Sequence, residues 1–137
     1  MIQYNDQVMK PGIDSVLLGS VASRFAFSKA IDLGCGSGIL SLMLSRSNKS
    51  SIVTGLDVDS HCISVCMANT SANSDLGPLE FICSDMFEFG WDRSGTYDLV
   101  VSNPPYFIGQ LDSSSASRYF QRHWSLDQLK KFSRLCS

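Results

Sequence analysis

The sequence lacks a long apolar run, and none of its runs approaches the roughly eighteen residues that a membrane-spanning helix needs. Its first twelve residues have neither the basic start nor the apolar core of a secretion signal. Charged residues make up 18% of the chain and apolar residues 44%, proportions that are ordinary for a globular protein and argue against disorder. We therefore expect a cytoplasmic protein that does not enter a membrane.

The sequence also lacks a Cys-x-x-Cys pair, and its cysteines are odd in number, which disfavours a disulfide framework and a zinc site. Cys62 and Cys66 could share one face of a helix, but the only histidine near them, His61, falls on another face. We expect reduced, mostly buried thiols and no metal site. The cysteines are Cys35, Cys62, Cys66, Cys83 and Cys136.

Basic residues are scarce in most of the chain. Residues 1–111 carry six Lys or Arg against eleven Asp or Glu, a net charge of −5. Residues 112–137 carry five against two, a net charge of +3, and the two parts together give the −2 of the whole chain. The basic segment suits a phosphate-bearing partner, and it equally suits a solvated helix face.

Short apolar stretches that read as strands alternate with helical stretches, and no internal repeat or linker interrupts them. We predict strands over 29–34, 51–57, 79–85 and 96–102, and helices over 13–25, 38–47, 60–73 and from Ser125 onward. This alternation favours βαβ units and hence a parallel sheet with right-handed crossovers. At 137 residues, the chain has the length of about one domain.

Details of the helices follow from local patterns. Asp14 is a candidate cap for the first helix, and Ile63, Met67 and Cys66 are expected to face inward from the third. Ser125, with Gln128 three residues later, forms a capping-box pattern. Residues 107–124 read as a long loop.

Polar residues follow each predicted strand, and the carboxyl ends of parallel strands form one edge of a sheet, where ligands bind. Singly, each cluster also reads as a tight turn or a helix cap. Together they predict one binding site. The clusters contain Asp32, Gly34, Gly36 and Gly38 after the first strand, Asp57 and Asp59 after the second, Asp85 after the third, and Asn103, Pro104, Pro105 and Tyr106 after the fourth.

The glycine spacing indicates which kind of ligand binds. It is Asp-x-Gly-x-Gly-x-Gly, whereas dinucleotide sites read Gly-x-Gly-x-x-Gly. Asp32 within this turn would repel a phosphate, and it suits a ligand with an ammonium group. Gly34 and Gly36 would let that ligand approach the backbone closely.

The residues after the next two strands predict further groups of the same ligand. Asp57 lies nineteen residues after Gly38, where a carboxylate can accept both hydroxyls of a ribose. Asp85 could accept a hydrogen bond from an adenine amino group. An ammonium group, a ribose and an adenine together describe S-adenosylmethionine.

This order of motifs resembles the class I methyltransferases, whose first motif is the Asp-x-Gly-x-Gly-x-Gly turn. The resemblance implies an α/β, Rossmann-like fold, with a parallel sheet and helices on both faces, and S-adenosylmethionine as cofactor. It implies one domain over residues 1–137. The cofactor-binding residues that we predict are Asp14, Asp32, Gly34, Cys35, Gly36, Gly38, Asp57, Val58, Asp85 and Asn103.

Class I methyltransferases have seven strands in the order 3-2-1-4-5-7-6, and only four strands are predicted here. We therefore expect a fold that is truncated after its fourth strand and lacks strands 5 to 7. The fourth strand would be an exposed edge, through which the chain could associate with itself.

The Asn-Pro-Pro-Tyr stretch resembles a second motif, found in methyltransferases that act on planar amino nitrogens of bases or of the glutamine amide. In that family the asparagine side-chain oxygen, here of Asn103, and the next carbonyl, of Pro104, accept the two N–H bonds of the nitrogen. The two prolines fix this backbone. The resemblance implies the catalytic residues Asn103, Pro104, Pro105 and Tyr106, and the substrate-binding residues Tyr106, Phe107 and Arg118, with the aromatics stacking on a flipped base.

The segment before the glycine turn is similar to that of the bacterial methyltransferases that modify adenine N-6 in valine tRNA. The matching residues are Lys10, Gly12, Asp14, Leu17, Leu18 and Gly19, and later Ala116, Arg118 and Tyr119, whereas Ile13 replaces a threonine. The resemblance implies methyl transfer to the exocyclic amino nitrogen of adenine in tRNA. The alternatives are a glutamine-amide methyltransferase acting on translation release factors and a non-catalytic cofactor-binding fragment.

Overall fold

The computed structural model describes residues 12–90, 96–104 and 130–131 of the chain. The chain divides into two compact units, Met1–Asn103 and Pro104–Ser137, and the helices and strands below belong to the first. The expectation that residues 1–137 form one domain stays a prediction. Several predicted features lie outside the described residues, namely Lys10, Pro105, Tyr106, Phe107, the 107–124 loop with Ala116, Arg118 and Tyr119, the Ser125 capping box and Cys136.

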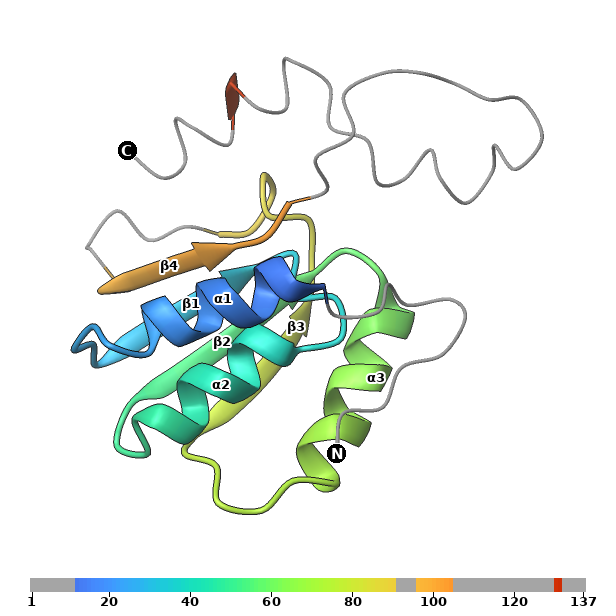
Figure 1. Cartoon of the computed structure of the whole chain (residues 1–137). Coiled ribbons are helices and arrows are strands. Elements are labelled where there is room, and N and C mark those ends of the chain that lie inside the picture. Colours follow the sequence, from blue (N-terminus) through green and yellow to red (C-terminus); the bar gives the residue numbers. More distant parts are fainter. Residues whose placement is uncertain (1–11, 91–95, 105–129, 132–137) are drawn as a thin grey trace. The chain divides into compact units, whose positions relative to one another are not determined.

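The strands form a parallel sheet in the order β3-β2-β1-β4 (Figure 1), as predicted. In the register of this sheet, Asp32 lies beside Gly55 of β2 and Val101 of β4. Within the described part of the chain β4 is an edge strand, and self-association through it stays a prediction. The strands are β1 (Lys29–Leu33), β2 (Ile52–Asp57), β3 (Leu79–Cys83) and β4 (Leu99–Ser102).

The helices are α1 (Ile13–Ala22), α2 (Ile39–Ser47) and α3 (Ser60–Ser71). Helices α1 and α2 pack on each other over one face of the sheet (Figure 1), and α3 packs against β2 and β3. The chain moves in the same direction from β1 to β2 and from β2 to β3, so right-handed crossovers put α2 and α3 on one face. None of the helices in the described ranges is both long and apolar enough to cross a bilayer.

The core lies between α1, α2 and the sheet, and strand alternation decides which side chains enter it. Ala30, Val53 and Val101 point into this core from three neighbouring strands. Because successive side chains of a strand alternate between faces, Asp32 lies on the same face as Ala30, and Asn103 on the same face as Val101. Two polar side chains are therefore directed toward the helices at the carboxyl edge of the sheet.

Two helix predictions are wrong. Gly12, not Asp14, is the N-cap of α1, and Asp14 lies in the first turn, where a carboxylate suits the helix dipole. Met67 is 61% exposed, because it lies one position beyond the buried face of α3. That face consists of Cys62, Cys66 and Asn69.

The thiol prediction holds in the described ranges. Cys35, Cys62 and Cys66 are buried thiols, Cys83 is an exposed one, and none of the four forms a disulfide. Cys62 and Cys66 do share one face of α3, as expected. That face packs toward the sheet and not toward solvent, so these cysteines are part of the packing of α3.

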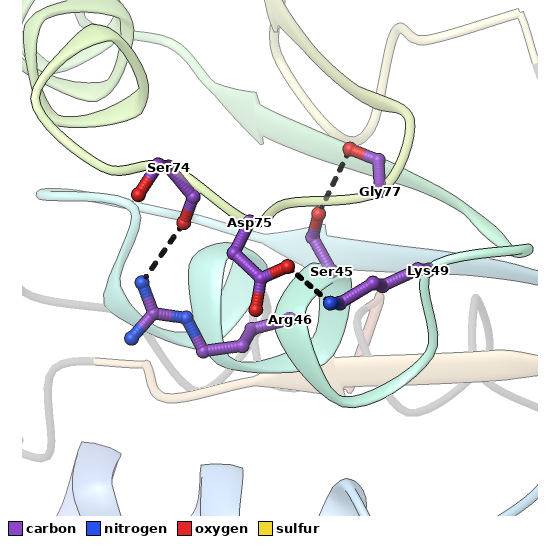
Figure 2. Close-up of polar contacts among 6 residues, drawn as sticks. All are labelled: Ser45, Arg46, Lys49, Ser74, Asp75 and Gly77. Carbon is purple, nitrogen blue, oxygen red and sulfur yellow. Dashed lines mark hydrogen bonds and ion pairs between the residues drawn. The ribbon is translucent and has the colours of Figure 1, made fainter.

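Polar contacts join the end of α2 to the segment that leads into β3 (Figure 2). The Ser45 hydroxyl donates to the carbonyl of Gly77 at 3.0 Å, and the Gly77 N–H donates to the Ser45 carbonyl at 3.2 Å. These contacts fix where β3 begins beside β2. The segment is also held by the Arg46 guanidinium, which donates to the Ser74 carbonyl, and by an ion pair of Lys49 with Asp75.

Replacing Ser45 with alanine should lower the free energy of unfolding by about 1 kcal/mol, because the side chain is fully buried and the Gly77 carbonyl loses a donor. Urea denaturation measures this change. Ser64→Ala is the matched control, since its exposed hydroxyl donates only to the Ser60 carbonyl of its own helix. Equal midpoints for the two variants would contradict the role of Ser45.

Candidate functional site

The polar residues at the four strand ends of the first unit meet at one edge of the sheet, because the strands are parallel and adjacent. Hydrogen bonds tie each strand end to its neighbour, so the edge is one connected unit. The bonds run from the Gly34 and Cys35 N–H groups to the Leu56 carbonyl at 2.8 and 3.0 Å, from the Ser84 N–H to the Asp57 carbonyl at 2.9 Å, and from the Ser102 hydroxyl to the Leu33 carbonyl at 2.7 Å.

The glycine turn between β1 and α2 has a left-handed backbone at each of its glycines, with φ of +72° at Gly34, +55° at Gly36 and +79° at Gly38. A side chain at Gly38 would meet Cys66 Sγ at 3.0 Å, so this glycine is needed for packing. A side chain at Gly36 would meet no atom within 4 Å. Space beside Gly36 therefore lets a ligand come close to the backbone.

Helix α3 holds the glycine turn in place. The Cys66 thiol donates to the Gly36 carbonyl at 3.2 Å, and the Asn69 amide donates to the Ser37 carbonyl at 3.0 Å. The Cys35 thiol lies 3.8 Å from that of Cys66, and this hydrogen bond, together with burial, raises the pKa of Cys35. Cys35 is thus a neutral thiol and not a nucleophile.

No sequence pattern assigned Cys66 and Asn69 to the site, because their partners lie 30 and 32 residues away in the chain. The available signal was their spacing, since residues three apart lie on one helix face. Spacing predicts a buried face, but not the carbonyl groups that this face contacts.

Asp57 connects the glycine turn to the start of α3. One carboxylate oxygen accepts the Gly36 N–H at 2.9 Å, and the other accepts the Asp59 N–H at 3.0 Å. Asp59 in turn caps α3 by accepting the His61 N–H at 2.9 Å. Each Asp57 oxygen keeps a further lone pair, so binding of ribose hydroxyls is compatible with these bonds and stays a prediction.

Replacing Asp57 with asparagine should weaken binding of S-adenosylhomocysteine about 10-fold, because a single amide oxygen cannot accept from both Gly36 and Asp59 and the charge is lost. Isothermal titration calorimetry measures the affinity. The control is Asp59→Asn, since asparagine caps a helix as well as aspartate does. Wild-type affinity in both variants would refute the ribose assignment.

Asp85 and Val58 complete the predicted cofactor residues on this side of the site. Asp85 accepts the Phe87 N–H at 2.8 Å and so begins the turn that follows β3. Val58, directly after β2, is 67% exposed. An exposed apolar side chain and a carboxylate after the neighbouring strand suit an adenine ring, and this role also stays a prediction.

The position of Asp32 differs from the one that the sequence predicted. It lies within β1, not in the turn, and its side chain is fully buried. One carboxylate oxygen accepts from the Ser41 N–H at 3.1 Å and the Ser41 hydroxyl at 2.7 Å, in the first turn of α2. Burial raises the pKa of Asp32 to about 6; the hydrogen bonds from Ser41 lower it, and the charge of Asp57 raises it. Contact with an ammonium group stays a prediction.

Asn103, the residue after β4, points toward α1. Its side-chain nitrogen donates to the Ser15 hydroxyl at 2.8 Å, and Ser15 is buried. Its side-chain oxygen is buried and accepts no hydrogen bond. Across the described ranges, this oxygen and Oδ1 of Asp32 are the buried side-chain N or O atoms without a partner. Both lie at the carboxyl edge of adjacent strands.

The other predicted site residues contribute less. Asp14 is exposed on the first turn of α1, and Pro104 is half-buried and belongs to the second unit. No group of three or more His, Cys, Asp or Glu side chains able to hold a metal ion occurs in the part of the chain that the structure describes.

Comparison with known proteins identifies relatives. Residues 12–130 match the family model described as the methyltransferase small domain. A protein of Parabacteroides distasonis named tRNA1(Val) (adenine(37)-N6)-methyltransferase is 34% identical, over 89% of this chain and 51% of the relative. A protein of the same name from Pectobacterium carotovorum is 33% identical, over 91% of this chain and 51% of the relative. The chain thus spans about half the length of these relatives.

Solved structures share the fold. A protein of Pyrococcus horikoshii described as a candidate RNA methyltransferase has a TM-score of 0.58 and 25% identity, and the match covers 74% of this chain and 48% of that one. The ribosomal protein L11 methylase of Lactobacillus delbrueckii has a TM-score of 0.57 and 17% identity, and the match covers 74% and 51%. At that identity, the second likeness supports the fold alone.

Proposed function

Because this chain belongs to the methyltransferase small domain family, we propose that it transfers a methyl group to the exocyclic amino nitrogen of adenine in tRNA. The family uses S-adenosylmethionine, which confirms the cofactor prediction. The choice of tRNA adenine is supported by the names of the curated relatives. Since the chain spans about half of their length, the activity of this chain is itself part of the proposal.

The observation that carries the proposal is the hydrogen bonding of the Asn103 side chain, whose oxygen is buried without a partner. The amino nitrogen of adenine delocalises its lone pair into the ring and is a poor nucleophile. With its own nitrogen bonded to Ser15, the Asn103 amide presents an oxygen that can accept an N–H of that amino group. Accepting this hydrogen draws the nitrogen toward tetrahedral geometry and frees its lone pair. The carbonyl of Pro104 would accept the second N–H.

Positioning then accounts for most of the catalysis that we propose. In the best model systems, orientation of two reactants contributes roughly 7 to 11 kcal/mol to lowering a barrier. S-adenosylmethionine, when bound, supplies a methyl group on a positively charged sulfur. No side chain with a matched pKa is needed as general base, because the amino nitrogen becomes positively charged on methylation and then releases its proton to water.

The residues at the strand ends fit this cofactor. The glycine turn lets the ligand approach the backbone at Gly36, Asp57 would hold the ribose hydroxyls, and the unpartnered Oδ1 of Asp32 would face the ammonium group. Asp85 and Val58 would hold the adenine. We assign these residues to the cofactor, together with Asp14, Gly34, Cys35 and Gly38.

Binding of tRNA would use the second unit. There we propose that Tyr106 and Phe107 stack on the flipped base and that Arg118 contacts phosphate, although these residues lie outside the described ranges. The net charge of +3 on residues 112–137 supports a phosphate-bearing partner, and Lys130 and Lys131 are exposed. Modification of tRNA would place the protein in the cytoplasm.

The test is methyl transfer from radiolabelled S-adenosylmethionine to total tRNA and, separately, to translation release factors. We expect label in tRNA, recovered as N-6-methyladenosine after nuclease digestion. Label in the release factor instead would favour the glutamine-amide alternative. Cofactor binding without transfer to either acceptor would refute catalysis by this chain and favour a cofactor-binding fragment.

A further inference from the structure

Ser15 lies on α1, far from any strand end in the sequence, yet it contacts the site. Its hydroxyl oxygen accepts a hydrogen bond of 2.8 Å from Nδ2 of Asn103, which is 88 residues away in the chain. The Ser15 side chain is 7% exposed, so water does not readily replace this contact. The bond is therefore a fixed link between α1 and the residue after β4.

In the structure this link engages the nitrogen end of the amide. A primary amide has an oxygen that accepts and a nitrogen that donates, and the two ends have nearly the same shape. When the nitrogen is bonded to Ser15, the oxygen is the end left without a partner. The opposite orientation would present an N–H donor, which suits an oxygen acceptor and not an amino group.

We infer that Ser15 is a positioning residue for methyl transfer, which holds the Asn103 amide so that its oxygen faces the amino nitrogen to be methylated. The inference rests on the proposed function and deepens it, because it assigns the positioning of the Asn103 amide to a side chain on α1. The inference assigns Ser15 no contact with either reactant. Its effect is on the orientation of Asn103, and so on turnover, not on cofactor binding.

The helix around Ser15 supplies a matched control. Ser20 lies on the same helix, is exposed, and donates its hydroxyl to the Val16 carbonyl of α1 at 2.8 Å. Ser15→Ala and Ser20→Ala therefore make the same chemical change in the same helix, but only the first removes the partner of Asn103. Ser15→Thr keeps the hydroxyl and tests for rescue.

The first measurement is made on the full chain labelled with 15N and does not depend on turnover. We expect nuclear Overhauser contacts between the Asn103 side-chain NH2 protons and the β protons of Ser15. In Ser15→Ala the Asn103 side-chain NH2 resonances should shift and exchange faster with solvent, whereas in Ser20→Ala they should not change. Absence of the contact in the wild type would overturn the inference.

The second measurement is the kinetics of methyl transfer to tRNA. Ser15→Ala should reduce kcat about 10- to 100-fold, the range that a small misplacement of a reacting group produces, with little change in S-adenosylhomocysteine affinity. Ser15→Thr should recover most of the loss, and Ser20→Ala should be as active as the wild type. An unchanged kcat in Ser15→Ala would overturn this inference alone, whereas an inactive wild type would overturn the proposed function.

Discussion

Replacing Asn103 with alanine is expected to reduce methyl transfer by at least about 100-fold, while the affinity for S-adenosylhomocysteine stays within about twofold of the wild type. Loss of one preorganised hydrogen-bonding group in an active site typically costs about 100- to 1,000-fold in kcat. When the side-chain oxygen of Asn103 is missing, the amino nitrogen of the methyl acceptor keeps its planar geometry and its delocalised lone pair. The measurements are radiolabel transfer to tRNA and calorimetric titration of the cofactor product.

The stability of Asn103→Ala should change little. The variant loses the hydrogen bond to Ser15, which contributes about 1 kcal/mol, but it also removes a buried oxygen that has no partner. Asn48→Ala is a suitable control, because the Asn48 amide donates to the Phe27 carbonyl at 3.0 Å, away from the strand ends. Weak cofactor binding in Asn103→Ala, with transfer unaffected, would show that our role for Asn103 is wrong.

The second large effect is expected at Asp32, and it concerns stability. The pKa of this buried carboxyl is about 6 in the folded chain, against an ordinary value of 3.8. Between those two values the unfolded chain has released the proton and the folded chain has kept it, so the free energy of unfolding falls as the pH rises through this window. A difference of about two pKa units corresponds to about 3 kcal/mol.

Asp32→Asn should therefore raise the free energy of unfolding at pH 7 by about 1 to 3 kcal/mol and flatten its fall between pH 4 and pH 6. Urea denaturation at several pH values measures both. The amide oxygen can still accept from Ser41, so the fold is kept. If the carboxylate faces the ammonium group of the cofactor, the stabilised variant should also bind the cofactor more weakly.

Asp98 supplies a control of opposite sign. The N–H groups of Ser28 and Lys29 donate to this exposed carboxylate and hold its pKa below the ordinary value. Its contribution to stability is present at neutral pH and is lost as the pH falls, so Asp98→Asn should destabilise the chain at pH 7. A wild-type pH dependence in Asp32→Asn would contradict our explanation.

The two effects bear on a single question, namely why the edge of the sheet keeps polar atoms that the fold leaves unsatisfied. A buried acceptor without a partner costs free energy, and proteins satisfy nearly all such groups. Here the two exceptions within the described ranges are Oδ1 of Asp32, on β1, and Oδ1 of Asn103, directly after the adjacent strand β4. The Asp32 oxygen suits a cofactor that carries an ammonium group. The Asn103 oxygen suits a methyl acceptor that carries an amino group.

The sequence by itself determined the order of helices and strands, the parallel sheet, the glycine turn and the family. Apolar alternation, turn residues and motif spacing act over a few residues, so they can be read without knowing the fold. The class I fold and the cofactor that this resemblance implied are confirmed. The convergence of the four polar clusters followed from the parallel sheet, because parallel strands end at a common edge.

Only the tertiary structure decided how the polar atoms at that edge are used. The sheet order puts β4 beside β1, under α1, and so brings Ser15 to Asn103 across 88 residues. It also buries Asp32 against the start of α2, whereas the sequence pattern placed this residue in the glycine turn. Hydrogen bonds of this kind depend on how the helices pack on the sheet. A local sequence pattern does not predict which partner a given side chain will have.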